Sequence, residues 1–318
     1  MTIPTLESIR DARSRIAGRV HLTPMLRSRT LAERAGAASL FLKCESLQKT
    51  GSFKVRGALT AVSQLDEASR RAGVVTVSAG NHAQALAWAA AAFGVRCTVV
   101  MPAKASESKA AAATGYGAEV IRHGTAADAF AKADELARAK GLTMVHPFDD
   151  PRIMAGTGTI GLEILEQAPD TDLIVVPIGG GGLIAGIAAA VRQATSNVRV
   201  IGVEPEGAAA MRASLDAGKP VRLDTLNTIA DGLAAPFAGE LTYPIVRDLV
   251  DDVVTVTDEE IAAAMGLILT RCKLLAEPAG AAATAALIAG KLPQASGKRV
   301  VVLLSGGNVD LSRVKELV

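Results

Sequence analysis

The 318-residue sequence has few of the residues that build disulfide or zinc frameworks. It contains three cysteines and four histidines, and both sets are scattered along the chain. Cys44, Cys97 and Cys272 are odd in number and form no Cys-x-x-Cys pair, so they predict free thiols in a reducing, cytoplasmic setting. The histidines lack the spacing of a zinc motif.

The sequence also lacks an excess of charge of either sign. Lysine and arginine total 34 and aspartate and glutamate total 32, for a formal net charge of +2. This balance gives no reason to expect a nucleic-acid partner or an acidic tail. Hydrophobic residues make up 49% and charged residues 21%, which is typical of globular proteins, and the length suggests about two domains.

Neither a secretory leader nor a membrane helix is expected. Residues 2–15 contain three arginines and no apolar core of a signal peptide. Residues 173–191 are uncharged and long enough to span a bilayer, but Pro177 and four consecutive glycines interrupt them. Because proline and glycine break helices, this run predicts a strand, a loop and a helix, with no membrane partner.

Short β-branched runs alternate with alanine-rich stretches along most of the chain. This βαβ alternation predicts parallel sheets with right-handed crossovers, in an α/β fold. Strands are predicted over Val74–Ser78, Cys97–Met101, Glu119–Arg122, Thr143–His146, Leu173–Ile178, Val198–Val203 and Arg299–Leu304. Helices are predicted over Asn81–Phe93, Ser106–Thr114, Ala126–Lys140, Ile184–Ala194 and Glu259–Arg271.

The four glycines Gly179–Gly182 follow a predicted strand and precede a predicted helix. Free backbone N–H groups converge at such a helix N-terminus, and the helix dipole favours an anion there. Without Cβ atoms the loop can approach a phosphate closely. Two other interpretations stay open. One is a flexible turn. The other is the dinucleotide fingerprint G-x-G-x-x-A, with Gly180, Gly182 and Ala185 followed by Glu204 on the ribose.

A lysine in an unusual setting occurs in the segment 48–58, QKTGSFKVRGA. Lys54 stands between Phe53 and Val55, after a Thr-Gly-Ser loop. A lysine that is partly desolvated there has a lowered pKa, and its neutral amine can form a Schiff base. The alternative is a solvated surface charge, as for most lysines.

Two further strand ends carry polar residues. The segment 78–84, SAGNHAQ, joins a predicted strand to a helix N-terminus, where the Asn81 and His82 amides form a nest suited to a small carboxylate. Simple helix capping by Ser78 is the alternative. Ser305 begins SGGN at the carboxyl end of a predicted parallel strand, where ligands of α/β proteins bind. Its hydroxyl is placed to pair with a ring nitrogen, or else the segment is a tight turn.

Together these segments resemble one family closely. GSFKVRGA, SAGNHAQ, PIGGGGLIAG and SGGN occur in the order and spacing of the pyridoxal-phosphate enzymes of fold type II. Among these, the chain looks like the catabolic threonine/serine dehydratases and the related serine racemase. The resemblance covers nearly the whole chain. It implies an α/β fold of two open, twisted, mostly parallel sheets flanked by helices, like the tryptophan synthase β chain. It also implies a large cofactor-binding domain (1–72 and 150–318) and a small mobile domain (73–149).

The resemblance assigns roles to individual residues. Lys54 matches the catalytic lysine that holds pyridoxal 5'-phosphate. The other residues that match cofactor-binding positions are Phe53, Asn81, Gly179, Gly180, Gly181, Gly182, Leu183, Gly232 and Ser305. The residues that match the loop for the substrate carboxylate are Ser78, Asn81 and His82.

Three departures from the family pattern narrow these expectations. Ala79 stands where the racemase has a serine that acts as its second acid/base, so elimination is expected to dominate over racemisation. The family's cation site matches at Glu204 and Ala208, but Ala210 replaces its second carboxylate. This leaves a weak divalent site, a monovalent ion or no metal open. The sequence ends at Val318 without a regulatory domain, so feedback by isoleucine is not expected.

The expected reaction removes water from a 3-hydroxy amino acid, L-threonine or L-serine, and gives a 2-oxo acid and ammonia. The expected assembly is a homodimer or homotetramer. Serine racemisation and dehydration of hydroxyaspartate or phenylserine are alternatives on the same machinery. Two remote alternatives remain. A nicotinamide-dependent oxidoreductase leaves the Lys54 segment unexplained, and the intact Lys54 argues against a non-catalytic ligand-binding protein on the same fold.

Overall fold

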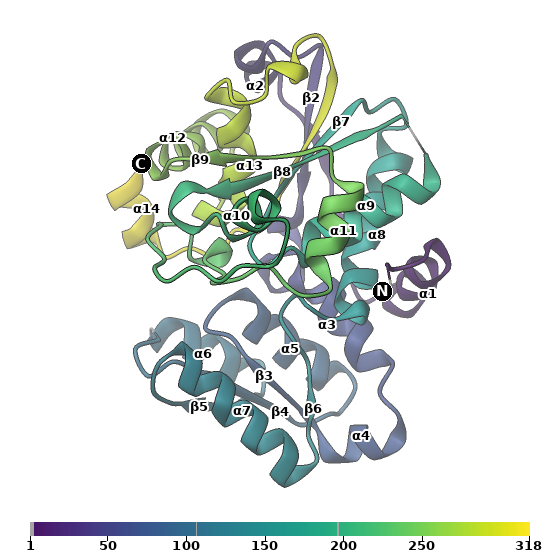
Figure 1. Cartoon of the computed structure of the whole chain (residues 1–318), viewed down its shortest axis with the longest axis vertical. Helices are drawn as coiled ribbons and strands as arrows, with labels where there is room; N and C mark the ends of the chain where they lie inside the picture. Colours follow the sequence, from purple (N-terminus) through teal and green to yellow (C-terminus); the bar gives the residue numbers. More distant parts are fainter. Residues whose placement is uncertain (1–2, 106, 196) are drawn as a thin grey trace.

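The computed structural model describes residues 3–105, 107–195 and 197–318, and the strands of these residues form two separate sheets (Figure 1). The larger sheet contains, in order, β1 (Met25–Arg27), β2 (Ser39–Cys44), β10 (Arg299–Leu304), β7 (Leu173–Pro177), β8 (Arg199–Pro205) and β9 (Asp252–Val256). Its neighbours pair in parallel except for β1 and β2. The smaller, parallel sheet contains, in order, β5 (Glu119–Arg122), β4 (Cys97–Met101), β3 (Val74–Val77) and β6 (Thr143–Met144). The predicted α/β fold of two mostly parallel sheets is confirmed.

Helices cover both faces of the larger sheet. Along β10, Val300 and Val302 pack in one apolar cluster, and Val301 and Leu303 pack in another, as the twofold alternation of a strand requires. The first cluster includes α2 (Arg29–Ala35), α12 (Asp258–Leu267) and α13 (Pro278–Ile288). The second includes α8 (Pro151–Gln167), α9 (Gly182–Ala194), α10 (Ala210–Ala217) and α11 (Thr242–Leu249). Further out lie α1 (Leu6–Ile16), which packs on α8 and α9, and the exposed α14 (Leu311–Leu317).

The smaller sheet is covered in the same way. On one face lie α3 (Lys54–Ser63), α5 (Asn81–Ala92) and α6 (Glu107–Gly115), and on the other lies α7 (Ala126–Lys140). α4 (Glu67–Ala72) runs beside this sheet (Figure 1). Because α3 contributes Val55 and Leu59 to the core of the smaller sheet, the small domain's limits of 73 and 149 stay a prediction.

Glycines on α8 set the spacing of three helices. A Cβ on Gly156 would lie 2.6 Å from the Arg56 carbonyl oxygen in α3. A Cβ on Gly158 would lie 3.0 Å from the Gly186 carbonyl oxygen in α9, and one on Gly161 would lie 3.1 Å from that of Ile187. These close approaches require glycine, so α8 holds α3 and α9 at a fixed separation.

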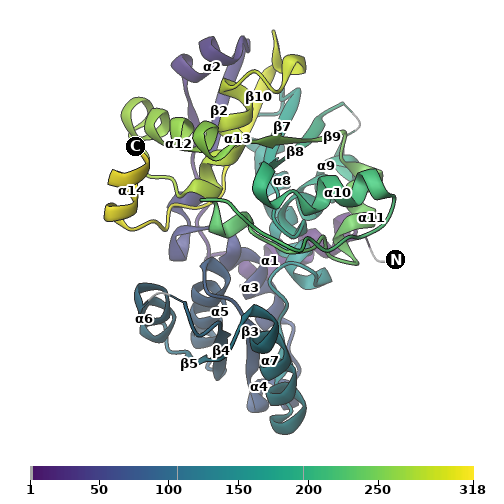
Figure 2. The same cartoon turned by 60° about the vertical axis from the view of Figure 1, so that its left-hand side comes forward.

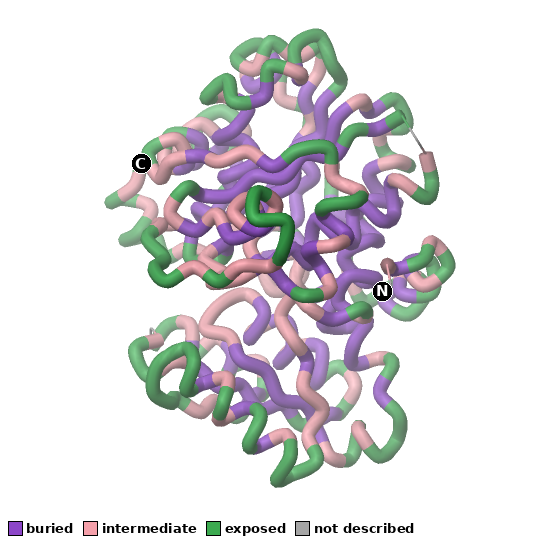
Figure 3. Tube along the Cα trace, in the orientation of Figure 1, coloured by how far each residue is buried: buried purple, intermediate pink, exposed green. Residues whose placement is uncertain are grey.

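The two sheets bring different chain segments toward each other (Figures 1 and 2). The segment 78–84 follows β3 in the smaller sheet, and Gly179–Gly182 follow β7 in the larger one. Residues 145–150 lead from β6 of the smaller sheet to α8 (Figure 1). The central strands of both sheets are largely buried, whereas the edge strands β1, β5 and β6 are partly exposed (Figure 3). Residues 173–191 form β7, the glycine loop and part of α9, and no helix in the described ranges is long and apolar enough to cross a membrane.

The predicted elements are found within a few residues of their bounds. β4, β5 and β10 match their predicted ranges, and α7 does as well. The predicted helix 106–114 appears as α6, although Ser106 itself lies outside the described residues. The helix predicted to end at Arg271 instead ends its α-helical part at Leu267 and continues as a π-helix over Ile268–Cys272.

Candidate active site

Lys54 is the first residue of α3 and is only partly buried. Its Nζ donates a hydrogen bond to the Pro147 carbonyl oxygen at 2.8 Å and lies 5.1 Å from the centre of the Phe53 ring. Desolvation lowers the pKa of Lys54 to about 8, and the Glu277 carboxylate opposes this shift. An amine with this pKa is half neutral at about pH 8 and keeps a neutral fraction at pH 7, and that fraction can act as a nucleophile or as a base.

The glycine loop joins β7 to the N-terminus of α9. Gly181 has φ +95°, which favours glycine, and no side chain caps the helix. A Cβ on Gly180 would lie 2.3 Å from the Phe148 ring, and one on Gly182 would lie 2.6 Å from the Phe148 carbonyl oxygen. Thr242 Oγ1 donates to the Gly180 carbonyl oxygen at 2.6 Å and so fixes the loop from its other side. The loop therefore has uncapped amides and no room for side chains, as an anion site at a helix N-terminus requires.

The segment after β3 also leads into a helix without a side-chain cap. The N-cap of α5 is Gly80, and Ser78 Oγ accepts from the Gly80 amide at 3.1 Å rather than from an amide of the helix. The alternative of simple helix capping by Ser78 is therefore wrong. The His82 ring is buried, with Nε2 3.3 Å from the Val145 carbonyl oxygen, and burial together with Lys54 lowers its pKa to about 3. His82 is thus neutral and faces Val145 with its side chain.

Asn81 is held by two residues that the sequence analysis missed. Its Nδ2 donates to Glu277 Oε1 at 2.6 Å, and its Oδ1 accepts from Asn308 Nδ2 at 2.9 Å. Burial raises the pKa of Glu277 to about 7, and the hydrogen bond from Asn81 opposes this. In the sequence, Glu277 is a single acid before Pro278, without a motif that separates it from a surface charge.

Ser305 and Gly232 both lie next to Ala279. Ser305 follows β10 and is buried, with Oγ 3.4 Å from the Ala279 carbonyl oxygen. A Cβ on Gly232 would lie 2.9 Å from the Ala279 Cβ, and one on Gly179 would lie 3.4 Å from the Gly232 carbonyl oxygen. The Phe53 amide donates to the Ser305 carbonyl oxygen at 3.1 Å.

These contacts bring most of the predicted site residues together. A chain of neighbours runs from the glycine loop through Gly232 and Ala279 to Ser305, and from Ser305 through Phe53 to Lys54. Gly180 and Lys54 also contact adjacent residues, Phe148 and Pro147, in the segment that links the two sheets. Leu183 follows the loop as the second residue of α9. Glu277 is a neighbour of both Asn81 and Gly232, so it links the α5 start to this group.

At the predicted cation position, the Glu204 carboxylate is hydrogen-bonded to backbone amides. Both oxygens of buried Glu204 accept hydrogen bonds from the start of α10, from the Met211 amide at 2.8 Å and the Arg212 amide at 2.7 Å. Ala208 ends the short 3-10 turn before α10, and Ala210 is its first residue. The described residues contain no group of three His, Cys, Asp or Glu side chains that could hold a metal ion.

Comparison with known proteins identifies the family. A family model described as pyridoxal-phosphate dependent enzyme matches residues 16–306. The chain is 46% identical over 314 residues to the catabolic L-threonine dehydratase TdcB of Escherichia coli K12, covering 98% of this chain and 95% of that protein. It is 47% identical over 311 residues to an L-threonine ammonia-lyase of Geobacter sulfurreducens, covering 98% of this chain and 77% of that protein.

Two solved structures have the same fold. A serine racemase of maize superposes with a TM-score of 0.95 at 40% identity, covering 99% of this chain and 97% of that one. A serine racemase of Dictyostelium discoideum superposes with a TM-score of 0.92 at 40% identity, covering 97% of this chain and 100% of that one. The chain belongs to the pyridoxal-phosphate dependent enzyme family, and the resemblance stated from the sequence is confirmed.

The residues present fit this cofactor. The glycine loop offers amides to a phosphate where side chains would collide with Phe148, and Lys54 has a pKa of about 8. Two buried polar atoms of this region, Ser52 Oγ and His82 Nδ1, have no hydrogen-bond partner among the described residues. An orphaned polar atom in a folded interior is rare, so these two are available to a bound group.

Proposed function

We propose that this chain is a pyridoxal-phosphate dependent ammonia-lyase that removes water from L-threonine or L-serine and gives a 2-oxo acid and ammonia. Relatives that match it over 98–99% of its length at 41–47% identity are named threonine dehydratase or threonine ammonia-lyase. The observation that carries the proposal is the Lys54 amine, whose pKa is about 8 and which is held at the glycine-lined site. That amine suits the removal of an α-proton.

The chain's own residues supply binding and proton transfer. The amides of Gly179–Gly182 and Leu183, with the α9 dipole, hold a phosphate. The uncapped start of α5 holds the substrate carboxylate. Asn81, fixed by Glu277 and Asn308, presents a side chain of set orientation. Bound pyridoxal phosphate supplies the electron sink for the carbanion. Lys54 would take the α-proton, and buried Ser305 would offer a neutral hydroxyl to the cofactor ring.

Serine racemisation is a second candidate, because the maize racemase has the same fold over nearly its whole length. Ala79 argues for elimination, since an alanine methyl has no proton to give to the opposite face of the α-carbon. The proposed protein is a homodimer or homotetramer of the cytoplasm, and its three free cysteines support a reducing compartment.

A 2-oxo acid assay across four substrate types tests the function. L-Threonine, L-serine, 3-hydroxyaspartate and phenylserine are each incubated with the purified holoprotein, and the keto acid and ammonia are quantified. We expect both products in equal amounts from threonine or serine. A yellow protein that releases neither product from any of the four would refute the dehydratase and leave the family assignment intact.

A further inference from the structure

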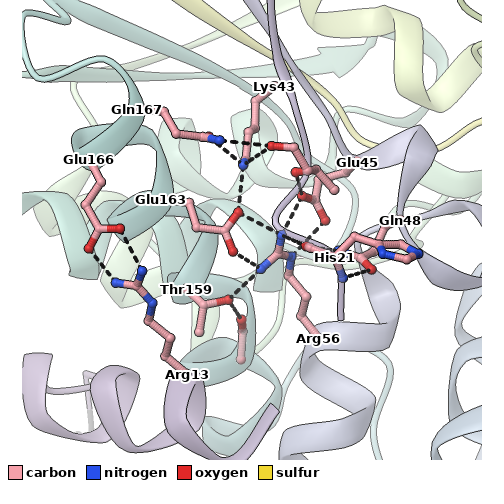
Figure 4. A network of polar contacts seen from close by, with 12 residues as sticks. Arg13, His21, Lys43, Glu45, Gln48, Arg56, Thr159, Glu163, Glu166 and Gln167 are labelled. Atoms are coloured by element: carbon pink, nitrogen blue, oxygen red, sulfur yellow. Dashed lines mark hydrogen bonds and ion pairs between the residues drawn. The ribbon is translucent and has the colours of Figure 1, made fainter. Parts of the chain in front are cut away.

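A buried network of charges surrounds Arg56, two residues after Lys54 in α3 (Figure 4). Arg56 is fully buried and forms two forked contacts with carboxylates. Its Nε and Nη2 each donate to Glu45 at 2.8 Å, and its Nη1 and Nη2 donate to Glu163 at 2.6 and 3.0 Å. Nη1 also donates to Thr159 Oγ1 at 3.2 Å. The guanidinium thus joins α3 to α8 and to the turn after β2.

Lys43 completes the network from β2. Its Nζ donates to Glu163 Oε2 at 2.6 Å, to Gln167 Oε1 at 2.8 Å and to the Thr23 carbonyl oxygen at 2.9 Å. Two cations and two anions therefore balance inside the protein, and all four side chains are buried. A buried charge without a partner is costly, so the contacts hold these segments in one arrangement.

Arg56 and Lys54 leave the first turn of α3 on opposite sides. At 3.6 residues per turn, residues two apart are about 200° apart around a helix. Lys54 Nζ accordingly reaches Pro147 at the site, while the Arg56 side chain reaches Glu45 and Glu163 behind the helix. Contacts that fix the Arg56 side of this turn therefore also fix the direction in which the Lys54 side chain leaves the helix.

The start of α3 has no side-chain cap, and Val55 packs it against the core of the smaller sheet. Its N-cap is Phe53, which makes no side-chain capping hydrogen bond. The Phe53 amide is held by the Ser305 carbonyl oxygen, and the Arg56 carbonyl oxygen lies against Gly156 of α8. Without a cap, the position of the first turn depends on the Arg56 side chain, on this helix contact and on the packing of Val55.

We propose that Arg56, with Glu45 and Glu163, is a positioning residue that sets where Lys54 Nζ lies relative to the glycine loop. This inference rests on the proposed role of Lys54 as the lysine that bears the cofactor. Because the network is neutral overall, it acts on Lys54 through geometry rather than through net charge. The Arg56 partner Glu163 lies on α8, and α8 packs closely on α9 at Gly158 and Gly161. Arg56 is thereby linked to the helix that follows the glycine loop.

Two substitutions in the same network separate positioning from simple stability. Arg56→Lys keeps the buried positive charge but cannot form two forked contacts. Lys43→Met is the matched control. It removes the β2 cation that contacts Glu163 of α8 and leaves the two forked contacts of Arg56 in place. Full-length proteins are equilibrated with graded pyridoxal phosphate and trapped with borohydride, and the modified fraction of the Lys54 peptide is measured by mass spectrometry. Urea unfolding and the pH dependence of the visible absorption band are recorded in parallel.

We expect Arg56→Lys to need about tenfold more cofactor for half-modification of Lys54 and to shift the pH dependence of the band, because small misplacements of reacting groups have large effects. Lys43→Met should stay within about threefold of the unaltered protein on the same scale, even where it unfolds at lower urea. Equal losses in the two variants, in step with their unfolding midpoints, would show a structural role only and overturn the proposal.

A third variant covers the case in which Arg56→Lys does not fold. Glu45→Gln keeps the side-chain shape and breaks one fork, and we expect a modified fraction that is lower at sub-saturating cofactor concentrations. A curve identical to that of the unaltered protein would overturn the proposal. If the unaltered protein itself gains no label at Lys54, the proposed function fails instead, and the two failures are thereby distinguished.

Discussion

Glu277 Oε1 accepts a 2.6 Å hydrogen bond from Asn81 Nδ2, and this contact joins the turn before α13 to the first residue of α5. α13 packs on the larger sheet and α5 on the smaller one, so the carboxyl group links the two halves of the site. Glu277 is buried, and burial raises its pKa from 4.5 to about 7. It thus holds or loses a proton in the physiological range, next to the residue proposed to contact the cofactor.

Glu277→Gln tests this burial through the pH dependence of stability. A carboxyl whose pKa is higher in the folded state favours folding fully below its unfolded pKa, and this contribution is lost as the pH rises through about 7. Glutamine does not ionise. The unfolding free energy of the variant, relative to the unaltered protein, should therefore rise between pH 4.5 and pH 8, by roughly 3 kcal/mol at most.

Urea unfolding at both ends of this pH range measures the difference. Glu240→Gln, at an exposed position, is the matched control. A difference between Glu277→Gln and the unaltered protein that stays flat with pH would mean that the Glu277 carboxyl is solvated.

The glycine loop predicts an order of severity for two alanine substitutions. The Cβ of Gly182→Ala would meet the Phe148 backbone oxygen, which cannot move aside, whereas that of Gly180→Ala would meet the Phe148 ring, which can turn. We expect Gly182→Ala to weaken pyridoxal phosphate binding by about tenfold or more, and Gly180→Ala by less. Gly115→Ala, where a Cβ meets nothing within 4 Å, is the control. Absorbance titration with the cofactor gives the three affinities, and the reverse order would contradict the loop geometry.

Ala79 determines the expected balance between elimination and racemisation. In the proposed mechanism Lys54 would remove the α-proton in either reaction, and Ala79, whose methyl group has no proton to give, could not return one from the opposite face. The unaltered enzyme should convert little L-serine to D-serine, and Ala79→Ser should gain measurable racemisation while it retains dehydration. Ala79→Gly, which adds no hydroxyl, is the control. Chiral chromatography of the serine pool decides, and D-serine formed by the unaltered enzyme as fast as pyruvate would refute the role of Ala79.

Removal of divalent cations should have little effect on turnover. Both oxygens of Glu204 are engaged by amides of α10, and Ala210 offers no ligand oxygen in its side chain. We expect the rate after treatment with a chelator to stay within about twofold of the untreated rate, since a hard cation needs several oxygen ligands. A large loss that added Mg²⁺ restores would show that the backbone and Glu204 rearrange to bind it.

The sequence was most informative where local pattern and tertiary environment agree. β4 and β10 are short apolar or β-branched runs between clear breaks, and their bounds, like those of β5, were predicted. The strand β2 was not predicted, because its Lys43 is charged and is buried only through partners on α8 and at Thr23. The helix α8 was not predicted either. Its glycines oppose helix formation, and they are there because α3 and α9 approach too closely for a side chain.

The candidate site shows the same division. Lys54, the glycine loop and Ser305 were predicted because each follows a recognisable loop or strand end. Glu277 was not, because its significance lies in burial beside Asn81, a residue 196 positions away. The alternative that Ser78 caps α5 was wrong, since its hydroxyl accepts a hydrogen bond from the Gly80 amide. Sequence periodicity does not show where one hydroxyl turns or which distant acid becomes buried.

The most direct test of the account compares the unaltered protein with Lys54→Ala in the conversion of L-threonine to 2-oxobutanoate. Because Lys54 is the proposed base for proton removal, the variant should fold, retain part of its affinity for pyridoxal phosphate through the glycine loop, and lose about 10²-fold or more of its rate. A Lys54→Ala protein that forms 2-oxobutanoate within about tenfold of the unaltered rate would contradict the account, since loss of a general base costs more than that.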